Sequence, residues 1–441
     1  MRVVSGPWPP NQMSRDSSKP NRGSNVAMPT NDRPKLLMVT HRLPHPPVRG
    51  DRIRTWHMLR QLQQRFDVHL ACVADEPPTL NSWRAIQRHV ADLEFEPVTP
   101  LVRRGRALRH LAAGKSITSA WFQSPRLRQT IERWVRREKF DVALAVCAAS
   151  APYLAGLPIP SRVIDLMDVD SRKWAELANT ARGPRRAIYN YEADALAREE
   201  AALAHQFDAL TVTTDAEAHA YRQLVPWADV HVVPNGVDLD YFASNDQCDR
   251  CTVAFCGALN YRPNVEGLLW FTRSIWPRIK AGRPDARFRI VGRRPDRAVR
   301  RLRHLPGVEL IGQVADVRPH LQNAAVVVAP LQVARGVQNK VLEAMAMARP
   351  TVVSPAAATG IDAVDAEHWH VAPSPDAWVR RVAELLDDPA AQRRIGAAAR
   401  SFVASDHQWS DAMSPLLDLL APRDITTPTE SADRPPLRLA A

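Results

Sequence analysis

The sequence has few cysteines and no long apolar run. Five cysteines among 441 residues are too few for a disulfide scaffold, and three of them fall in predicted strands, which indicates reduced thiols. The longest apolar stretches are too short to cross a bilayer. The first 25 residues contain no apolar core of a secretory signal. We therefore expect a cytoplasmic protein.

Several functional motifs are also absent. Cys248 and Cys251 form a CxxC pair, but no second cysteine or histidine pair follows at zinc spacing, so chance favours an incidental pair over a metal site. No helix-turn-helix, zinc-finger or RNA-binding motif accompanies the positive charge, which makes a nucleic-acid binder a weaker alternative. No pair of carboxylates can be assigned to hydrolase chemistry.

Positive charge is abundant and locally concentrated. The net charge is +12 and the isoelectric point is near 9.9, which favours an anionic partner. Residues 101–139 hold eleven basic residues and two glutamates, a local charge of +9, and leucines lie between them. A solvated helix face and a contact with an anionic membrane surface explain this stretch equally well.

Short apolar segments alternate with helical stretches along most of the chain. Seven strands are expected near residues 35–41, 68–74, 93–98, 141–148, 162–168, 209–215 and 230–236, and five more near 252–258, 287–293, 308–312, 324–330 and 351–355. Alternation of this kind predicts parallel, doubly wound sheets and hence an α/β fold.

The segment from Pro330 to Pro350, PLQVARGVQNKVLEAMAMARP, has the composition of a phosphate site. A buried strand is expected before it, then a polar loop with one glycine, then a helix from Asn339 to Met347. Unpaired N–H groups at such a helix start favour anions. Lys340 and Glu343 are three residues apart, so they share one face of this helix and lean toward the loop.

This segment resembles the signature of family 4 glycosyltransferases, in which two glutamates lie eight residues apart. LEAMA, from Leu342 to Ala346, matches the second half, whereas Arg335 stands where the first glutamate is expected. ARGVQNKVLEAMAM, the loop before Gly50, DLMDVDSRKW (165–174) and FCGALNYRPNVEGLLWF (255–271) are similar to a subgroup of sugar transferases associated with PEP-CTERM and exosortase exopolysaccharide loci. The similarity extends from about Lys35 to Leu420.

The resemblance implies a GT-B fold, two Rossmann-like doubly wound domains that face a cleft. It also implies retaining transfer from a nucleotide-diphosphate sugar to a glycan or lipid-linked acceptor, with no metal and no cofactor. Glu343 and Lys340 would be the catalytic residues. The implied donor-binding set comprises Gly50, Gly257, Asn260, Arg262, Arg335, Gly336, Lys340 and Glu343.

Two positions of this sequence depart from the family's donor-binding pattern. Ala258 and Pro263 or Asn264 stand where many family members have cations for the diphosphate. Lys340 and Arg335 would have to replace those cations, with Arg262 as a further candidate. Asp168 and Asp170, at the end of a predicted strand, are candidates for the acceptor side. Turn or helix-cap aspartates would give the same pattern.

The expected domains are a disordered tail (1–33), an acceptor-side domain (34–235) and a nucleotide-sugar domain (236–405). A single helix returning to the first domain (406–420) and a disordered tail (421–441) follow. Another GT-B enzyme, such as an epimerase or a phosphorylase, and a non-catalytic scaffold with this fold remain open. The subgroup resemblance favours a cytoplasmic enzyme held peripherally at the inner membrane.

Overall fold

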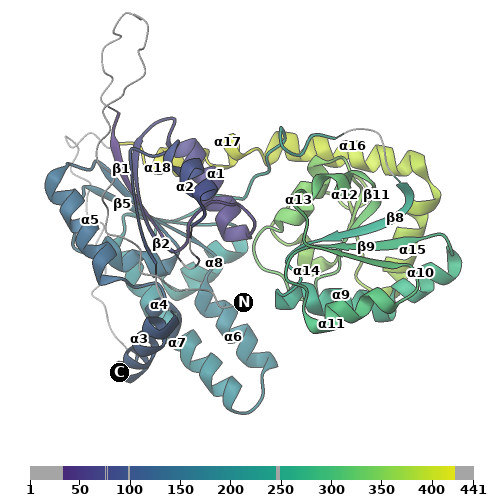
Figure 1. Ribbon diagram of the computed structural model, residues 1–441, viewed down its shortest axis with the longest axis horizontal. Coiled ribbons are helices and arrows are strands. Elements are labelled where there is room, and N and C mark those ends of the chain that lie inside the picture. Colours follow the sequence, from purple (N-terminus) through teal and green to yellow (C-terminus); the bar gives the residue numbers. More distant parts are fainter. Residues whose placement is uncertain (1–32, 75, 77, 98–99, 245–248, 423–441) are drawn as a thin grey trace, which may run out of the picture. The chain divides into compact units, whose positions relative to one another are not determined.

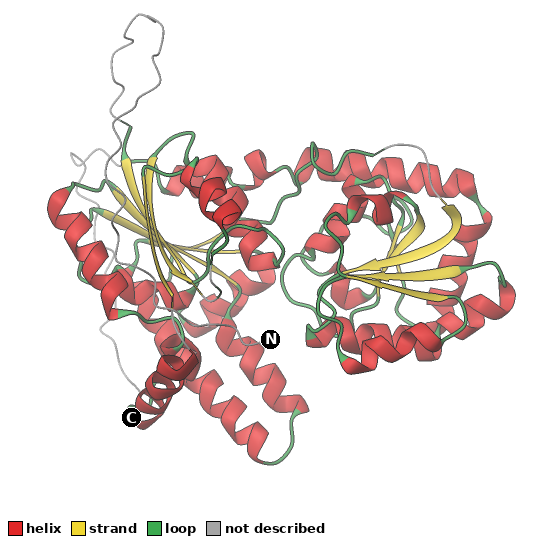
Figure 2. Ribbon diagram, viewed as in Figure 1, coloured by secondary structure: helices red, strands yellow, loops and turns green. Residues whose placement is uncertain are grey.

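The computed structural model describes residues 33–422 except 75, 77, 98–99 and 245–248. The predicted terminal tails therefore lie almost wholly outside the described residues, and so does Cys248. From residue 34 on, the described chain forms one compact unit built on two β-sheets (Figures 1 and 2). No helix among these residues is both long enough and apolar enough to cross a membrane.

The first sheet has seven parallel strands in the order β3-β2-β1-β4-β5-β6-β7. The strand order reverses between β1 and β4. In sheets of this kind, ligands bind outside the carboxyl ends of the strands at such a switch point. The strands are β1 (Lys35–Thr40), β2 (Asp67–Ala74), β3 (Asp92–Pro97), β4 (Val142–Val146), β5 (Ser161–Met167), β6 (Ala209–Val212) and β7 (Val230–Val232).

Helices cover both faces of this sheet because its central strands are apolar on both sides. One face packs against α5, α7 and α8, and the other packs against α1 and α2. The helices are α1 (Gly50–Leu62), α2 (Leu80–Gln87), α3 (Pro100–Ala112), α4 (Ile117–Ala120), α5 (Pro125–Arg137), α6 (Asp170–Thr180), α7 (Pro184–Gln206) and α8 (Asp215–Leu224), with a 3-10 turn, η1 (Ala148–Tyr153).

The second sheet has six parallel strands in the order β10-β9-β8-β11-β12-β13. Together the two sheets confirm the predicted α/β class. The edge strand β13 was not expected from the sequence, because it has only two residues and no apolar run. The strands are β8 (Asp249–Cys256), β9 (Arg287–Val291), β10 (Val308–Gly312), β11 (Ala324–Ala329), β12 (Thr351–Val353) and β13 (His370–Val371).

This sheet is also covered on both faces, with α9, α10 and α15 on one side and α12, α13 and α16 on the other. Buried residues of β8 alternate between these two cores, Phe255 facing the first and Cys256 the second. The elements are α9 (Arg262–Ser274), α10 (Trp276–Gly282), α11 (Arg297–Arg301), η2 (Leu302–His304), α12 (Arg318–Gln322), α13 (Asn339–Ala346), α14 (Pro355–Ala358), α15 (Pro375–Asp387) and α16 (Pro389–Asp406).

The chain after α16 packs against the first sheet's core. The single helix expected there is two short helices, α17 (Trp409–Ala412) and α18 (Ser414–Leu419). A new helix begins at Ser414 because Pro415 lacks the N–H that would continue α17. Trp409 stacks on His57 of α1, with ring centroids 4.8 Å apart and planes 5° apart.

Candidate functional site

Helix α13 has the structure that its sequence predicts. The buried strand β11 ends at Ala329, an irregular loop follows, and α13 begins at Asn339. Gln338 precedes the helix without a side-chain cap, so the first N–H groups of α13 are not satisfied by a capping side chain. The predicted helix start is therefore confirmed: α13 has eight residues, and Lys340 lies in its first turn.

Lys340 is anchored by an asparagine that stands where a cation was expected. Its Nζ donates to Asn264 Oδ1 at 2.6 Å, and Asn264 Nδ2 donates to the carbonyl of Ala258 at 2.9 Å. The ammonium also lies 5.5 Å from the ring centroid of Phe255. Burial lowers the pKa of Lys340 to about 8, and Glu343 opposes this shift.

Glu343 is the complementary group on the same helix face. Burial raises the pKa of its carboxyl to about 7, and the nearby Lys340 opposes the shift. No donor within the described chain binds its carboxylate, although part of the side chain reaches the surface. A carboxylate in this state can accept hydrogen bonds from two neighbouring hydroxyls of a ligand.

Asn339, the first residue of α13, connects this helix to the first sheet. Its Oδ1 accepts from Asn235 Nδ2 at 3.0 Å, and Asn235 Oδ1 accepts from Arg54 at 3.0 Å. Arg54 is itself fixed by two hydrogen bonds to the buried Asp165, at 2.7 and 2.8 Å. The Nδ2 of Asn339 is buried and has no partner in the described structure. That donor faces Gly50, since a Cβ on Gly50 would lie 3.9 Å from it.

The glycines assigned to the donor site differ in their surroundings. Gly50 begins α1, directly after the loop that follows β1. Gly257 follows β8, and a Cβ there would lie 3.0 Å from Asn264 Nδ2. Gly336 has a φ of +57°, and a Cβ on it would lie 2.7 Å from Asp168 Oδ1, so both conformation and space require glycine. Gly336 therefore brings the α13 loop against the end of β5.

The two expected phosphate-binding arginines already have acidic partners. Arg335 Nε donates to Glu176 Oε2 at 2.8 Å, and its Nη1 lies 3.6 Å from Glu217 Oε1. Arg262 Nε donates to Glu266 at 2.7 Å on the surface of α9. A phosphate would have to replace these carboxylates to bind either guanidinium. Asn260 is exposed, and no side-chain contact holds it within the described chain.

Asp168 and Asp170 lie at the carboxyl end of β5. Asp168 Oδ1 accepts from Thr213 at 3.2 Å, and burial raises the pKa of Asp168, with the charge of Asp170 adding to the shift. Asp170 begins α6 and lies 3.4 Å from Lys173, whose pKa it raises. Asp170 thus has the position of a first-turn aspartate, and Asp168 lies at the strand end against Thr213 and the loop at Gly336.

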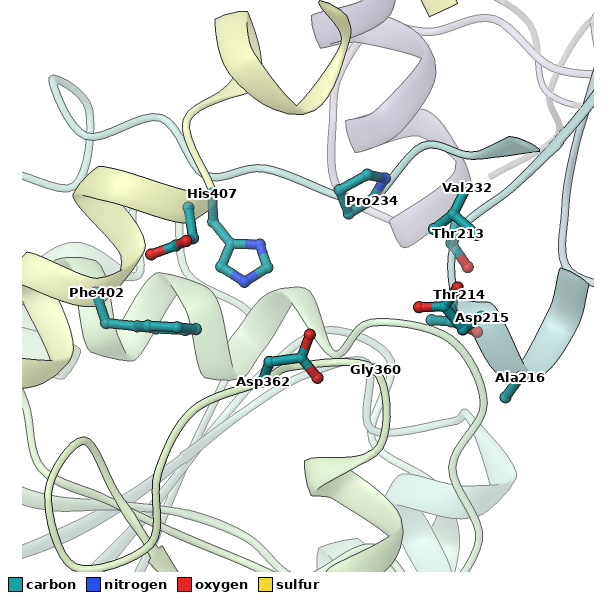
Figure 3. Close-up of a pocket in the computed structure, with 11 residues that line it drawn as sticks. Thr213, Thr214, Asp215, Ala216, Val232, Pro234, Gly360, Asp362, Phe402 and His407 are labelled. Atoms are coloured by element: carbon teal, nitrogen blue, oxygen red, sulfur yellow. The ribbon is translucent and has the colours of Figure 1, made fainter. Parts of the chain in front are cut away.

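A separate cavity of about 350 Å³ lies where the chain crosses between the two sheets (Figure 3). His407 borders it, and its Nδ1 donates to the carbonyl of Asn235 at 3.1 Å. None of the predicted site residues lines this cavity. Its walls are Thr213, Thr214, Asp215, Ala216, Val232, Pro234, Gly360, Asp362, Phe402, Asp406 and His407.

Two family models match the chain, one in each half. Residues 48–241 match the model described as "Glycosyltransferase Family 4", and residues 250–388 match "Glycosyl transferases group 1". The chain is therefore a glycosyltransferase with the GT-B fold. Its sequence matches no curated protein.

Solved structures with the same fold are distant in sequence. Sucrose-phosphate synthase (tll1590) from Thermosynechococcus elongatus has a TM-score of 0.65 at 15% identity, covering 87% of this chain and 98% of its own. TarM has a TM-score of 0.63 at 9% identity, covering 88% and 99%. Anabaena Alr3699/HepE, in complex with UDP and glucose, has a TM-score of 0.60 at 12% identity, covering 87% and 98%.

Proposed function

We propose that this glycosyltransferase moves a sugar from a nucleotide-diphosphate sugar to a hydroxyl of a glycan or lipid-linked acceptor, with retention of configuration, in exopolysaccharide synthesis. The PEP-CTERM-associated subgroup supplies the biological setting. HepE, with a similar fold, was solved with UDP and glucose, which supports a nucleotide-sugar donor. The observation that carries the proposal is the pair formed by Lys340 and Glu343 at the start of α13.

The reaction needs a site that stabilises a leaving diphosphate, because negative charge grows on it as the glycosidic bond breaks. The ammonium of Lys340 and the N–H groups at the start of α13 would supply that stabilisation. The donors are already fixed, since Asn264 positions Lys340 and Asn235 positions Asn339. Such preorganised donors lose little free energy to rearrangement during the reaction.

Glu343 would bind hydroxyls of the donor, on the ribose or the transferred sugar. Its carboxylate has no protein donor within the described residues, so a diol can take both oxygens. Gly50 and Gly257 would let the backbone approach the phosphates, and Asn260 and Gly336 would border the same space. Arg262 and Arg335 would join only when a phosphate displaces their carboxylate partners.

The acceptor would approach from the end of β5, where Asp168 and Asp170 lie. Helix α3 of the same half provides a surface suited to an anionic membrane. Val102, Leu108 and Leu111 are 44%, 68% and 45% exposed, and the arginines Arg104 and Arg109 are exposed beside them. Exposed leucines between arginines suit binding to an anionic interface. We therefore place the enzyme at the inner face of the cytoplasmic membrane.

Thermal shift against nucleotide diphosphates and nucleotide sugars tests the proposed donor class directly. A ligand that binds only the folded state raises stability by RT ln(1 + [L]/Kd), so about 2.7 kcal/mol is expected at a hundredfold excess over Kd. We expect one base to give the largest shift. The protein is then incubated with the matching nucleotide sugar and candidate acceptors, and the products are separated by mass. Sugar release or epimerisation without an acceptor would refute transfer.

A further inference from the structure

Four arginines from the two halves of the chain gather at one place. Arg49 and Arg52 flank Gly50 at the start of α1, and Arg293 and Arg294 follow β9. Arg52 and Arg294 converge on the single carboxylate of Glu76, at 3.6 and 3.2 Å. This shared contact brings the start of α1 and the end of β9 together.

Among the described residues, Glu76 and Asp51 are the carboxylates in contact with this arginine cluster (Arg49, Arg52, Arg293, Arg294). Glu76 is shared between two arginines, and Asp51, 3.3 Å from Arg49, also binds Arg42 at 2.7 Å. Arg293 has neither a hydrogen bond nor an ion pair through its side chain anywhere in the described structure. It is nevertheless partly buried.

A partly buried guanidinium with no partner in the described structure, such as that of Arg293, is unfavourable unless an anion binds beside it. Burial lowers the pKa of Arg293, and Arg49, Arg294 and Arg52 lower it further, while Glu76 opposes the shift. A partly buried charge among like charges costs free energy, and no side-chain hydrogen bond or ion pair of Arg293 among the described residues offsets that cost. Negative charge from a ligand would offset that cost.

The backbone places Arg293 beside the donor-site loop. Cys256 and Val291 are paired in register, so Gly257 and Gly292 follow their strands at the same sheet edge. A Cβ on Gly292 would lie 1.7 Å from the carbonyl oxygen of Gly257, and the N–H of Leu259 donates to the carbonyl of Arg293 at 3.0 Å. Gly257 thus has Arg293 on one side, and on the other it contacts Asn264, which binds Lys340.

We propose that Arg293, with Arg49 and Arg52 nearby, binds the diphosphate of the nucleotide-sugar donor and replaces the cations missing at Ala258 and Asn264. This inference rests on the proposed donor class. It changes the expected residue set, because Arg262 and Arg335 each have a carboxylate of their own. The carboxylates of Arg49 and Arg52 are shared with other arginines. A planar guanidinium suits phosphate oxygens, since it can donate two parallel hydrogen bonds.

Calorimetric titration of the full-length protein tests this assignment. The probes are the diphosphate of the preferred base, the matching monophosphate and inorganic pyrophosphate. Arg293→Ala should weaken diphosphate binding by roughly tenfold or more, the size of one lost charge-assisted contact, and monophosphate binding by less than about threefold. Arg293→Lys should restore part of the loss. Arg297→Ala is the matched control, because Arg297 is exposed four residues further on and no partner holds it in the described structure.

Each outcome has a distinct meaning. Equal diphosphate binding by wild type and Arg293→Ala would overturn the assignment, and so would an equal loss in Arg297→Ala. An equal loss of diphosphate and monophosphate binding would overturn it too, since it indicates a structural role. If wild type binds pyrophosphate through Arg293 but no nucleotide, the anion site stands and the proposed donor class fails. If wild type binds neither, both fail. A rise in the KM of the acceptor alone would also contradict the assignment.

Discussion

Arg335 of the α13 loop forms an ion pair with Glu176 of α6, with Nε 2.8 Å from Oε2. This arginine occupies the position at which the family signature has a glutamate. In this chain the residue at that position forms an ion pair between the two halves. The side chain of Glu176 is 44% exposed, so solvent screens the pair and its net contribution to stability is small.

A double-mutant cycle should detect this ion pair. Arg335→Glu would place a third carboxylate beside Glu176 and Glu217, and like-charge repulsion should lower Tm. Glu176→Arg in the same chain should recover most of that loss. We expect a coupling free energy of roughly 0.5–1 kcal/mol, measured by denaturant unfolding. Additive effects would mean that the pair does not form in solution.

Gly336→Ala should be destabilising for two separable reasons. The left-handed φ of +57° costs about 1 kcal/mol for a residue with a Cβ, and the Cβ would lie 2.7 Å from Asp168 Oδ1. Gly114→Ala is the control, since Gly114 has a φ of +67° and nothing within 4 Å of a Cβ. The difference between the two losses in unfolding free energy measures the crowding at Asp168, and equal losses would contradict the contact.

Lys340→Ala and Glu343→Ala should abolish transfer and leave the fold intact. Each removes a charged hydrogen-bonding group from the proposed donor site, which costs roughly 1.5–3 kcal/mol of donor binding. Donor titration and circular dichroism measure the two effects separately. Val333→Ala is a suitable control, because Val333 is 49% exposed in the same loop. Transfer within about threefold of wild type in both variants would remove these residues from the site.

The pH dependence of kcat/KM should be bell-shaped. Donor binding needs Glu343 ionised, which its pKa of about 7 allows only as pH rises through that value. It also needs Lys340 protonated, and a pKa of about 8 means that the charge is lost as pH rises further. The optimum therefore lies between about 7 and 8. Lys340→Arg should move the alkaline limb of the profile to higher pH, because arginine stays charged. An alkaline limb at unchanged pH would mean that another group causes it.

The fold was predictable because its signals are local. Apolar runs such as β11 and their alternation with helical periods define parallel strands without tertiary information. The places of Gly336 in a loop and of Lys340 in the first turn of a helix were predictable in the same way. The two-residue strand β13 has no such signal, since pairing with β12 alone defines it.

The site partners were not predictable because they depend on long-range contacts. Asn264 binds Lys340 across 76 residues of chain, and Glu176 binds Arg335 across 159. The family resemblance suggested Arg335 and Arg262 for the phosphates, and the sequence gave no sign of their carboxylate partners. Arg293 was overlooked because it belongs to no motif. It stands out only once β8 and β9 are paired.

The last prediction concerns the membrane. Helix α3 is oriented so that Arg106 donates to the carbonyl of Gln123 and His110 lies against Ser116 and Gln123. Arg104 and Leu108 are exposed on the opposite face, and Arg109 is exposed at the side of the helix. We expect reversible binding to anionic vesicles, weakened by salt because exposed charges are screened within about 10 Å at 0.1 M.

Co-sedimentation with anionic and neutral vesicles measures this binding. Arg104→Gln with Arg109→Gln should reduce binding by roughly 2 kcal/mol, about 1 kcal/mol per charge near the surface, and Leu108→Ser should reduce it further through lost burial. The control removes the same charge from α5, by Arg133→Gln with Arg136→Gln, where both arginines are exposed. If both pairs weaken binding equally, the net charge of the protein is responsible and α3 has no special role. Equal binding to neutral lipid would exclude the electrostatic contact, whereas displacement of the protein from vesicles by nucleic acid would favour a polyanion other than the membrane.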